Sequence, residues 1–360
     1  MKRLIPIFLT WLCFTACTSA VEAPEPFTVA LWNVQTLFDG REEGTEFRDF
    51  REAAGWTQEK YAARITAISQ AITQMTPSGT KPPALIGFNE VENLKVLDDL
   101  AWGLAKYGYN WTAFSAIPGA PFGIGFVSRY PITDVRAHSI TIEKGTAPRP
   151  LLEVRVEPQG KPIVFLLSHW KSKLGDETEI LRRASARVVQ RRLKELKESE
   201  AETPVIVMGD LNENHDEFFR RGERDLRLYS LLPDDPYVSE LALQLPAREW
   251  DFLVLSAEKP PLSLVEGIPA LYSPWGNEKH GGTYFFRGRW ESIDHILLSR
   301  GFFSGTGWTF IDAQVLNHEP FITSSGTPNR YITNSGRGLS DHLPLIVVLR
   351  YSNELNQKKE

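Results

Sequence analysis

Six stretches of the sequence place an acid, an amide or a histidine inside or directly after an apolar run. The residues are Asn33 in "WNVQTLFD", Glu90 in "ALIGFNEVEN", His169 in "LLSHWKSK", Asp210 and Asn212 in "VIVMGDLNEN", Asp294 in "SIDHILLS", and Asp341 with His342 in "GLSDHLPLIV". A buried carboxylate costs several kcal/mol unless it is paired or binds a metal ion. One such placement could be structural. Repeated placement at the ends of apolar runs indicates side chains that converge on one polar, chemically active site.

The elements that must position these residues are predicted as short strands and a few helices. Eight apolar runs predict strands at 27–34, 83–91, 123–130, 151–157, 163–170, 205–212, 292–299 and 343–350. Helical spacing of apolar residues predicts helices over 57–75, 93–106 and 177–200, with Thr57 as the N-cap of the first. Many strands and few helices predict sheets packed on each other with helices outside.

The bulk properties indicate one acidic globular domain. The chain has 360 residues and a formal net charge of −5, and residues 27–351 contain no repeat, low-complexity segment or clear linker. An acidic protein does not bind polyanions by its overall charge. This counts against a high-affinity nucleic-acid binder, but it does not exclude a nuclease, because bound metal ions add positive charge locally.

The N-terminus has the features of an export signal. Lys2 and Arg3 precede an apolar stretch that is too short to span a membrane, and residues 14–17, "FTAC", resemble a bacterial lipobox with Phe where Leu is usual. We expect residues 1–16 to be a signal peptide and Cys17 to be lipidated. Cleavage after Ala20 and a retained anchor are the alternatives.

The expected result of this processing is an exported, membrane-anchored lipoprotein, periplasmic or at the cell surface, or otherwise a periplasmic or secreted protein. Residues 17–26 are expected to form a tether and residues 352–360 a polar tail. Both cysteines, Cys13 and Cys17, lie in the N-terminal segment, so the domain has no disulfide and no thiolate ligand for zinc.

At the six stretches quoted above, the sequence resembles the endonuclease/exonuclease/phosphatase superfamily, which includes pancreatic-type deoxyribonuclease. The stretches occur in the family's order from Asn33 to His342. The similarity is strongest to exported bacterial members that begin "NVENLFD", with Gln35-Thr36 replacing Glu-Asn here and "NEVE" replacing the usual "QEV". The resemblance implies an α/β fold, a four-layered sandwich of two packed, mainly antiparallel β-sheets flanked by helices.

The resemblance also implies a metal site. Glu90 would hold one or two Mg²⁺ or Mn²⁺ ions through oxygen, and Asn33 and Asp341 would complete or support the ligand set. Arg149, just before a predicted strand, and Lys171 and Lys173, which follow His169, are weaker candidates for binding phosphate; a solvated loop is the alternative for the two lysines.

The remaining residues receive catalytic roles from the same resemblance. His342 would be the general base or would position the attacking water, and Asp294 would fix its tautomer. Asp210 would orient the water or bind a second metal ion. Two further residues, His169 and Asn212, would donate hydrogen bonds to the phosphate oxygens. His295 has no role that the resemblance supplies, and we expect it to be structural.

These features predict a metal-dependent phosphodiesterase, most simply a nuclease, that acts as a monomer on a phosphoester, with nucleic acid as one candidate substrate. A phosphomonoesterase of the same fold, acting on nucleotides, inositol phosphates or sugar phosphates, is the alternative. A non-catalytic surface binding protein on the same fold is the alternative of another class. The aromatic stretch "GTYFFRGRW", 282–290, could stack on a base or a lipid headgroup, or it could serve packing alone.

Overall fold

The computed structural model describes residues 25–352 except 77–79, 144, 146, 175–177, 202, 264–266 and 278–280. The expected signal peptide at 1–16, Cys17, most of the tether and nearly all of the polar tail lie outside the described residues. Within the described residues, no helix has both the length and the apolar character needed to cross a membrane.

The first sheet contains six strands in the order β15-β16-β1-β2-β4-β3. They are β1 (Phe27–Leu37), β2 (Leu85–Val91), β3 (Trp111–Ser115), β4 (Gly123–Ser128), β15 (Gly307–Val315) and β16 (Leu345–Ser352). β1 and β2 are parallel, and the other neighbouring strands are antiparallel. The central strands are buried on both faces, which explains why they are nearly continuous apolar runs in the sequence.

The second sheet contains eight strands in the order β5-β6-β7-β8-β14-β11-β10-β9. They are β5 (Ile132–His138), β6 (Leu151–Val156), β7 (Ile163–His169), β8 (Val205–Asp210), β9 (Leu231–Pro233), β10 (Leu253–Ser256), β11 (Ala270–Tyr272) and β14 (Asp294–Leu298). β7 and β8 are parallel, like β1 and β2 in the other sheet. A separate hairpin consists of β12 (Tyr284–Phe286) and β13 (Arg289–Glu291).

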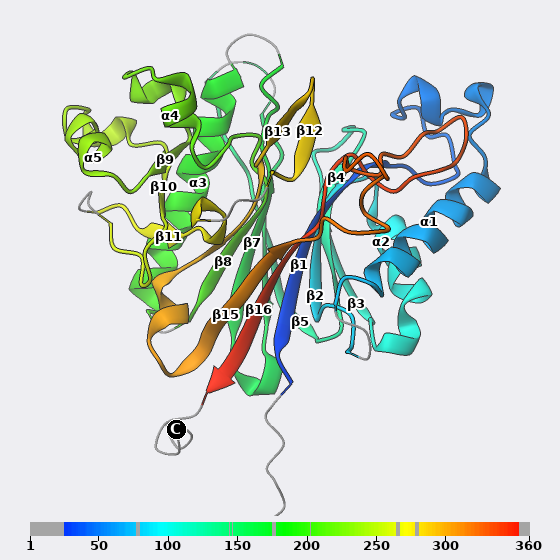
Figure 1. Cartoon of the computed structure of the whole chain (residues 1–360), viewed down its shortest axis with the longest axis horizontal. Coiled ribbons are helices and arrows are strands. Elements are labelled where there is room, and N and C mark those ends of the chain that lie inside the picture. The colour runs from blue at the N-terminus through cyan, green and yellow to red at the C-terminus, as the bar shows by residue number, and fades with distance from the viewer. Residues whose placement is uncertain are drawn as a thin grey trace, which may run out of the picture.

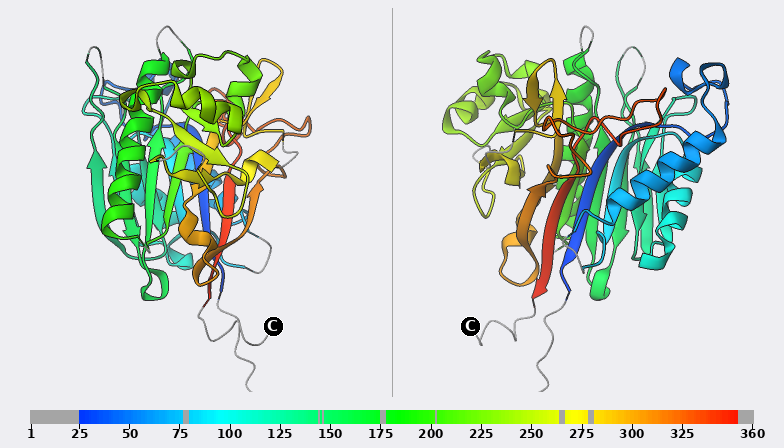
Figure 2. Two further views of the ribbon diagram at one scale, coloured as in Figure 1. Left: turned by 90° about the vertical axis from the view of Figure 1, so that its left-hand side faces the viewer. Right: turned by 45° about the vertical axis from the view of Figure 1, so that its right-hand side comes forward.

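The helices lie on the outer faces of the two sheets, as Figures 1 and 2 show. They are α1 (Gln58–Ile72), α2 (Leu94–Gly103), α3 (Thr178–Ser199), α4 (Glu217–Arg221) and α5 (Pro236–Leu243). Short 3-10 helices occur at Arg48–Phe50, Glu52–Ala54, Ala105–Tyr107, Pro158–Gly160, Leu226–Leu228, Ala247–Glu249, Pro274–Asn277 and Arg300–Phe303. α1 and α2 cover the six-stranded sheet, whereas α3 covers the eight-stranded sheet. The predicted four-layered α/β sandwich is confirmed.

Alternating side chains of one strand serve two different cores. In β7, Phe165 and Leu167 point into the core between the sheets, and Val164 and Leu166 point into a second core beneath α3. Successive side chains of a strand face opposite sides, so a strand between two apolar layers must be apolar at every position. This double burial fixes the register of the strand and therefore the position of the His169 at its end.

The predicted elements are all present, with ends shifted by a few residues. Thr57 caps α1 as expected, because its Oγ1 accepts a hydrogen bond from the backbone N–H of Lys60 at 3.3 Å. The strands that were missed include β5 and β15, which form edges of the two sheets and are largely exposed on one face. An edge strand of this kind mixes polar and apolar residues, so it does not appear as an apolar run.

Two of the parallel pairs, β1 with β2 and β7 with β8, end at the same edge of the sandwich. Asn33 pairs with Asn89 in one sheet, and Asp210 lies between His169 and Asp294 in the other. β14 and β16 run in the opposite direction, so the start of β14, Asp294, and the segment before β16, which contains His342, lie at this edge too. Ligands bind at the carboxyl ends of strands in many α/β proteins, and here the fold gathers the polar residues there.

Gly209 provides a test of this arrangement, because its backbone lies against β7 with φ of 148°. A Cβ built there would lie 1.8 Å from the carbonyl oxygen of Ser168. We expect Gly209→Ala to lower the free energy of unfolding by about 3 kcal/mol or more, since β7 and β8 must separate. Urea unfolding would measure this. Gly222→Ala is the matched control, with φ of 69° and open space around it, and should cost about 1 kcal/mol. Equal losses in the two variants would contradict the close-approach argument.

Candidate active site

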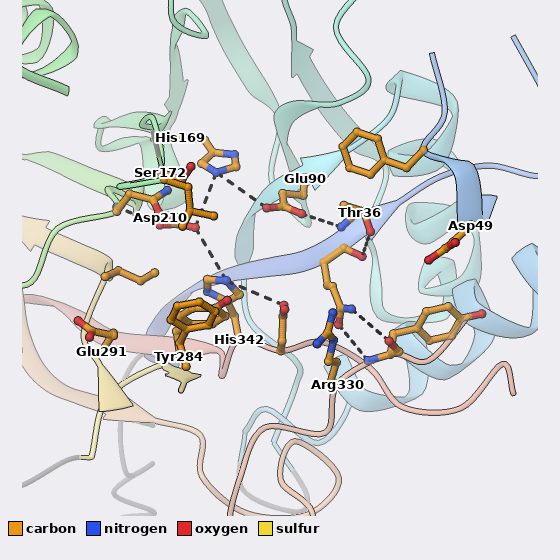
Figure 3. Close-up of a pocket in the computed structure, with 18 of the residues that line it drawn as sticks. Thr36, Asp49, Glu90, His169, Ser172, Asp210, Tyr284, Glu291, Arg330 and His342 are labelled. Carbon is orange, nitrogen blue, oxygen red and sulfur yellow. Dashed lines mark hydrogen bonds and ion pairs between the residues drawn. The ribbon is translucent and has the colours of Figure 1, made fainter. Parts of the chain in front are cut away.

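A cavity of about 890 Å³ opens at the edge where these strands end. Glu90, His169, Asp210 and His342 face one another across it, and Tyr284 lies over His342 (Figure 3). Its floor comes from the strand ends of both sheets, and its walls come from the 3-10 helix at Arg48–Phe50, the β12–β13 hairpin and the segment between β15 and β16. The convergence predicted from the sequence is therefore present in the fold.

His342 and Asp294 form a hydrogen-bonded pair that joins the two sheets. Nδ1 of His342 lies 2.8 Å from Oδ2 of Asp294, and the hydroxyl of Thr283 donates to the same oxygen at 2.6 Å. One face of the imidazole is covered by Tyr284, whose ring centre lies 4.6 Å away at an interplanar angle of 24°. This leaves Nε2 directed toward the acids, 4.0 Å from an oxygen of Asp210 and 4.0 Å from one of Asp341.

The charge of His342 is set by these neighbours. Burial alone would lower the pKa of the imidazole, but the charge and hydrogen bond of Asp294, together with the charges of Asp210 and Asp341, raise its pKa to about 10. The ring is therefore an imidazolium at neutral pH. The pair contributes stability that is fully present below the ordinary histidine pKa of about 6.5, and that is lost as the pH rises through about 10.

Glu90 and Asp210 are connected through Asn33. The amide nitrogen of Asn33 donates to Oε1 of Glu90 at 3.2 Å and to Oδ2 of Asp210 at 3.0 Å. Glu90 lies at a bulge, where the register of β2 shifts against both of its neighbours and φ is 64°. Bulges of this kind turn a side chain away from the regular alternation of a strand. Here the bulge directs Glu90 into the cavity.

These acids suit a hard divalent cation. Burial, joined by the charge of Asp341, raises the pKa of Glu90, and burial together with Asp294 raises the pKa of Asp210 to about 7. A nearby cation would stabilise both charged forms, and carboxylate and amide oxygens are the ligands that Mg²⁺ and Mn²⁺ accept. Asp210, Asp294 and His342 also lie within 4.8 Å of one another. Those three residues are a weaker candidate for a metal site than Glu90 and its neighbours, since Asp294 and His342 already bond to each other.

A buried arginine supports the turn that carries the first strand end. The guanidinium of Arg64 donates to three successive carbonyl oxygens, those of Val34 at 2.8 Å, Gln35 at 2.6 Å and Thr36 at 3.0 Å. Gln35 and Thr36 have positive φ angles of 50° and 51°, which is unfavourable for side chains of their size. In this conformation the N–H of Thr36 donates to Oε2 of Glu90 at 2.9 Å. Arg64 thus stabilises the backbone that holds Glu90.

The remaining predicted residues are placed around this centre. His169 is buried and directs Nε2 toward Asp210 at 3.7 Å, and burial, followed by the charge of Arg149, lowers its pKa well below 6.5. Asn212 lines the cavity and also closes a turn onto Asp210 through its backbone N–H at 3.0 Å. Asp341 lines the cavity beside His342. These positions agree with a shared site.

The three weaker phosphate candidates lie in different places relative to the cavity. Arg149 stacks on Phe122 at 4.7 Å, and Phe122 in turn stacks on His169, so the guanidinium lies behind the histidine near the acids. Lys171 is exposed and does not line the cavity, whereas Lys173 does, paired with Glu217. His295 is buried and bonds through Nε2 to the carbonyl oxygen of Glu213 at 2.8 Å, as expected for a structural residue.

The sequence reasoning missed Arg64, Tyr284 and Arg330. Tyr284 lies within the aromatic stretch that was noted, but its stacking on His342 joins residues 58 positions apart. Arg330 lines the cavity from a long segment without regular structure, and no hydrogen bond or ion pair found among the described residues uses its guanidinium. Only the residues at strand ends had a local signal, the interruption of an apolar run.

The fold and this site together define a class of hydrolase that binds a divalent metal ion and cleaves phosphoesters. The sequence profile described as the endonuclease/exonuclease/phosphatase family matches residues 28–221. The chain belongs to this family, and it is a metal-dependent phosphoesterase. The predicted resemblance is confirmed. No curated protein sequence matches the chain.

Several solved structures share the fold. A Danio rerio TDP2, humanised by 14 mutations, matches with a TM-score of 0.52 and 15% identity over 90% of this chain and 99% of that one. An endonuclease/exonuclease/phosphatase family protein from Bacteroides thetaiotaomicron matches with a TM-score of 0.52 and 17% identity, over 92% of this chain and 100% of that one. A mannosyl-6-phosphatase from the same species matches with a TM-score of 0.51 and 18% identity, over 90% of this chain and 100% of that one. Identities this low establish the fold and leave the substrate open.

The charge of His342 can be measured directly. In the metal-free protein, we expect NMR titration of the imidazole carbon shifts to give a pKa near 10 for His342. Asp294→Asn should lower this pKa, because the largest stabilising charge and its hydrogen bond are lost while burial remains. A His342 pKa near 6.5 in the unmutated protein would contradict the proposed charge.

Arg64 should affect both stability and metal binding. Arg64→Met leaves three carbonyls without their donor, so we expect the free energy of unfolding to fall by about 3 kcal/mol or more. The loss of free energy of unfolding in Arg64→Lys should be smaller than in Arg64→Met but still measurable, since an ammonium group cannot reproduce the planar array of guanidinium donors. Urea unfolding and Mn²⁺ titration calorimetry would measure both effects. Arg191→Met, on the exposed face of α3, is the control; if Arg64→Met bound Mn²⁺ as tightly as this control, Arg64 would have no part in positioning Glu90.

Proposed function

We propose that this protein is a phosphodiesterase that works with Mg²⁺ or Mn²⁺. The proposal rests on one arrangement above all. An imidazolium, His342, and an acid of raised pKa, Asp210, face the same cavity 4.0 Å apart, next to the carboxylate of Glu90. Hydrolysis of a phosphoester needs a proton acceptor for water, positive charge for the phosphoryl oxygens and a group that assists the leaving oxygen. The cavity offers residues for each of these.

Glu90, Asn33 and Asp341 are the residues that would hold the metal ion. When bound, the ion would supply positive charge to the phosphoryl group and to the leaving oxygen. To bind a metal ion, Asn33 would have to give up some of its present hydrogen bonds. Its Oδ1 accepts a hydrogen bond from the N–H of Gln35 at 3.0 Å, and its amide nitrogen donates to both Glu90 and Asp210. The Asn33 bridge keeps the two carboxylates close together in the absence of a cation.

The charges favour catalytic roles for His342 and Asp210 that differ from those expected from the sequence, where His342 was the general base or positioned the attacking water. A group that is already protonated at neutral pH does not serve as a base, so His342 would donate a hydrogen bond from Nε2 to a phosphoryl oxygen. Asp210, with a pKa raised to about 7, is the better proton acceptor for the attacking water. Asp294 would hold the imidazolium in place. His169 and Asn212 would orient the phosphoryl oxygens.

A phosphomonoesterase remains the second candidate because of Arg330. Its guanidinium lines the cavity and has no carboxylate partner within the described part of the chain. A monoester dianion carries one more negative charge than a diester, and such a cation would favour it. A purely binding role is less well supported, because buried acids with raised pKa values cost stability without contributing to packing.

The location of the protein is a separate proposal, carried by the N-terminal sequence alone. The basic residues at positions 2 and 3, the apolar stretch after them and Cys17 favour export and a lipid anchor. A membrane would then be the partner surface, and the substrate would be met outside the cytoplasm. We propose that the enzyme acts as a monomer, since one chain supplies every residue used above.

Hydrolysis assays on the purified protein test the activity. With Mn²⁺ or Mg²⁺ present, we expect release of p-nitrophenolate from bis-p-nitrophenyl phosphate and none in EDTA. Glu90→Ala and Asp210→Asn should abolish it, and His342→Ala should lower kcat by at least about 10²-fold. His318→Ala, a histidine outside the cavity, is the matched control.

Two results would change the proposal. Hydrolysis of p-nitrophenyl phosphate without any hydrolysis of the diester would replace it with the phosphomonoesterase. Full activity in His342→Ala or in Asp210→Asn would contradict the assigned roles, even if the diester is cleaved.

A further inference from the structure

The mouth of the cavity exposes several large apolar side chains. Large apolar side chains line it and are still exposed, namely Phe47 at 44%, Leu174 at 69%, Phe286 at 39% and Ile332 at 56%. They come from four separate segments of the chain. Single exposed apolar side chains are common on protein surfaces, but several around one cavity mark a place where an apolar group binds.

The rings on the β12–β13 side of the cavity are nearly parallel. Tyr284 stacks on His342, and Phe286 follows Tyr284 with ring centres 5.9 Å apart and an interplanar angle of 15°. A bridge between the backbones of Tyr284 and His342, and a hydrogen bond from the N–H of Leu343 to the carbonyl oxygen of Thr283 at 2.7 Å, fix the hairpin in this position. The aromatic faces therefore lead from the catalytic imidazole to the cavity mouth.

The hairpin stands at the top of the sandwich, above the ends of the central strands, as Figure 1 shows. In Figure 3, Tyr284 and His342 lie on one side of the cavity, with Asp49 far across it. The opposite wall carries Phe47, which packs edge-on against Phe38 and Phe122. A group attached to a phosphate beside His342 would therefore leave the polar floor and enter a space with aromatic side chains on both sides.

The charges around the mouth do not suit a long polyanion. Of the lysines and arginines among the described residues, two line the cavity, and Lys173 is paired with Glu217. Arg330 is the other, while Asp49 and Glu291 add negative charge. Proteins that bind single-stranded nucleic acids combine aromatic platforms with a positively charged groove along the backbone. The aromatic part is present here, and the extended positive groove is not formed by the described lining residues.

We propose that the mouth is a subsite for one planar ring, an aryl group or a nucleobase, carried by a small phosphodiester substrate. This inference rests on the proposed phosphodiesterase function and narrows it. The phosphoryl group would lie on the floor near His342 and Arg330, and the ring of the ester group that does not leave would contact Phe286. A polynucleotide would find one ring subsite and no path for its other phosphates.

The test uses diesters that share one leaving group. The p-nitrophenyl diesters of methanol, cyclohexanol, phenol and thymidine all release p-nitrophenolate, and only the second substituent changes. The purified full chain would be assayed with Mn²⁺, together with Phe286→Ala and with Leu243→Ala, an exposed apolar residue on α5 outside the cavity. Intrinsic reactivity is the same for every variant, so the ratio between variants reports binding.

In Phe286→Ala, we expect kcat/KM for the phenyl or the thymidine ester to fall about tenfold more than that for the methyl ester, mainly through KM, as one lost ring contact predicts. The cyclohexyl ester should follow the methyl ester. Leu243→Ala should leave every value unchanged. A selective loss for the thymidine ester would assign the subsite to a nucleobase, and a selective loss for the phenyl ester would assign it to an aryl group.

Other outcomes would overturn the inference. An equal fall for all four esters would mean that Phe286 only supports the hairpin, and a fall centred on the cyclohexyl ester would indicate an aliphatic, lipid-like substituent. A higher kcat/KM for single-stranded DNA than for any small ester would show that the mouth accepts a polymer. Absence of metal-dependent hydrolysis of every ester, the methyl one included, would instead reject the proposed function.

Discussion

The hydrogen bond between His342 and Asp294 joins two sheets that pack on each other mainly through apolar side chains. Asp294 begins β14 of the eight-stranded sheet, and His342 lies just before β16 of the six-stranded sheet, 2.8 Å away. The contacts of Asn33 with Asp210 and of Asn89 with the backbone of β7 and β8 bridge the same gap. Because each of these bonds crosses from one sheet to the other, the site forms only when the sandwich closes in the correct register.

The buried charges of the site impose a second constraint. Several carboxylates gather at one edge of the fold, and burial raises the pKa of both Glu90 and Asp210. Arg64 and Arg149 place positive charge behind them, and the imidazolium of His342 adds more in front. These cations offset part of the cost of gathering the acids, and a divalent cation would offset more. The gathered carboxylates are thus compatible with a stable fold, and they form a site where a divalent cation can bind.

The floor and the mouth of the cavity are built from different kinds of structural element. The floor of the cavity is built from strand ends, whose positions are fixed by two apolar cores. The mouth is built from the β12–β13 hairpin, the 3-10 helix at Arg48–Phe50 and the segment between β15 and β16, all outside the two large sheets. The hairpin also contacts the floor, because Tyr284 stacks on His342. The reaction class therefore follows from the family and the floor, whereas selection of the substrate by the mouth is our proposal.

The sequence by itself determined the sandwich fold, its central strands and the acids, amides and histidines of the floor, because each polar residue interrupts an apolar run and so leaves a local signal. Only the tertiary structure decided the charge of His342, the support that Arg64 gives to Glu90, the stacking of Tyr284 and the placement of Lys173 rather than Lys171 at the cavity. A pKa depends on charges from distant segments, and a stacked ring or a buried arginine depends on how those segments pack. Neither has a period or a spacing that can be found along the chain.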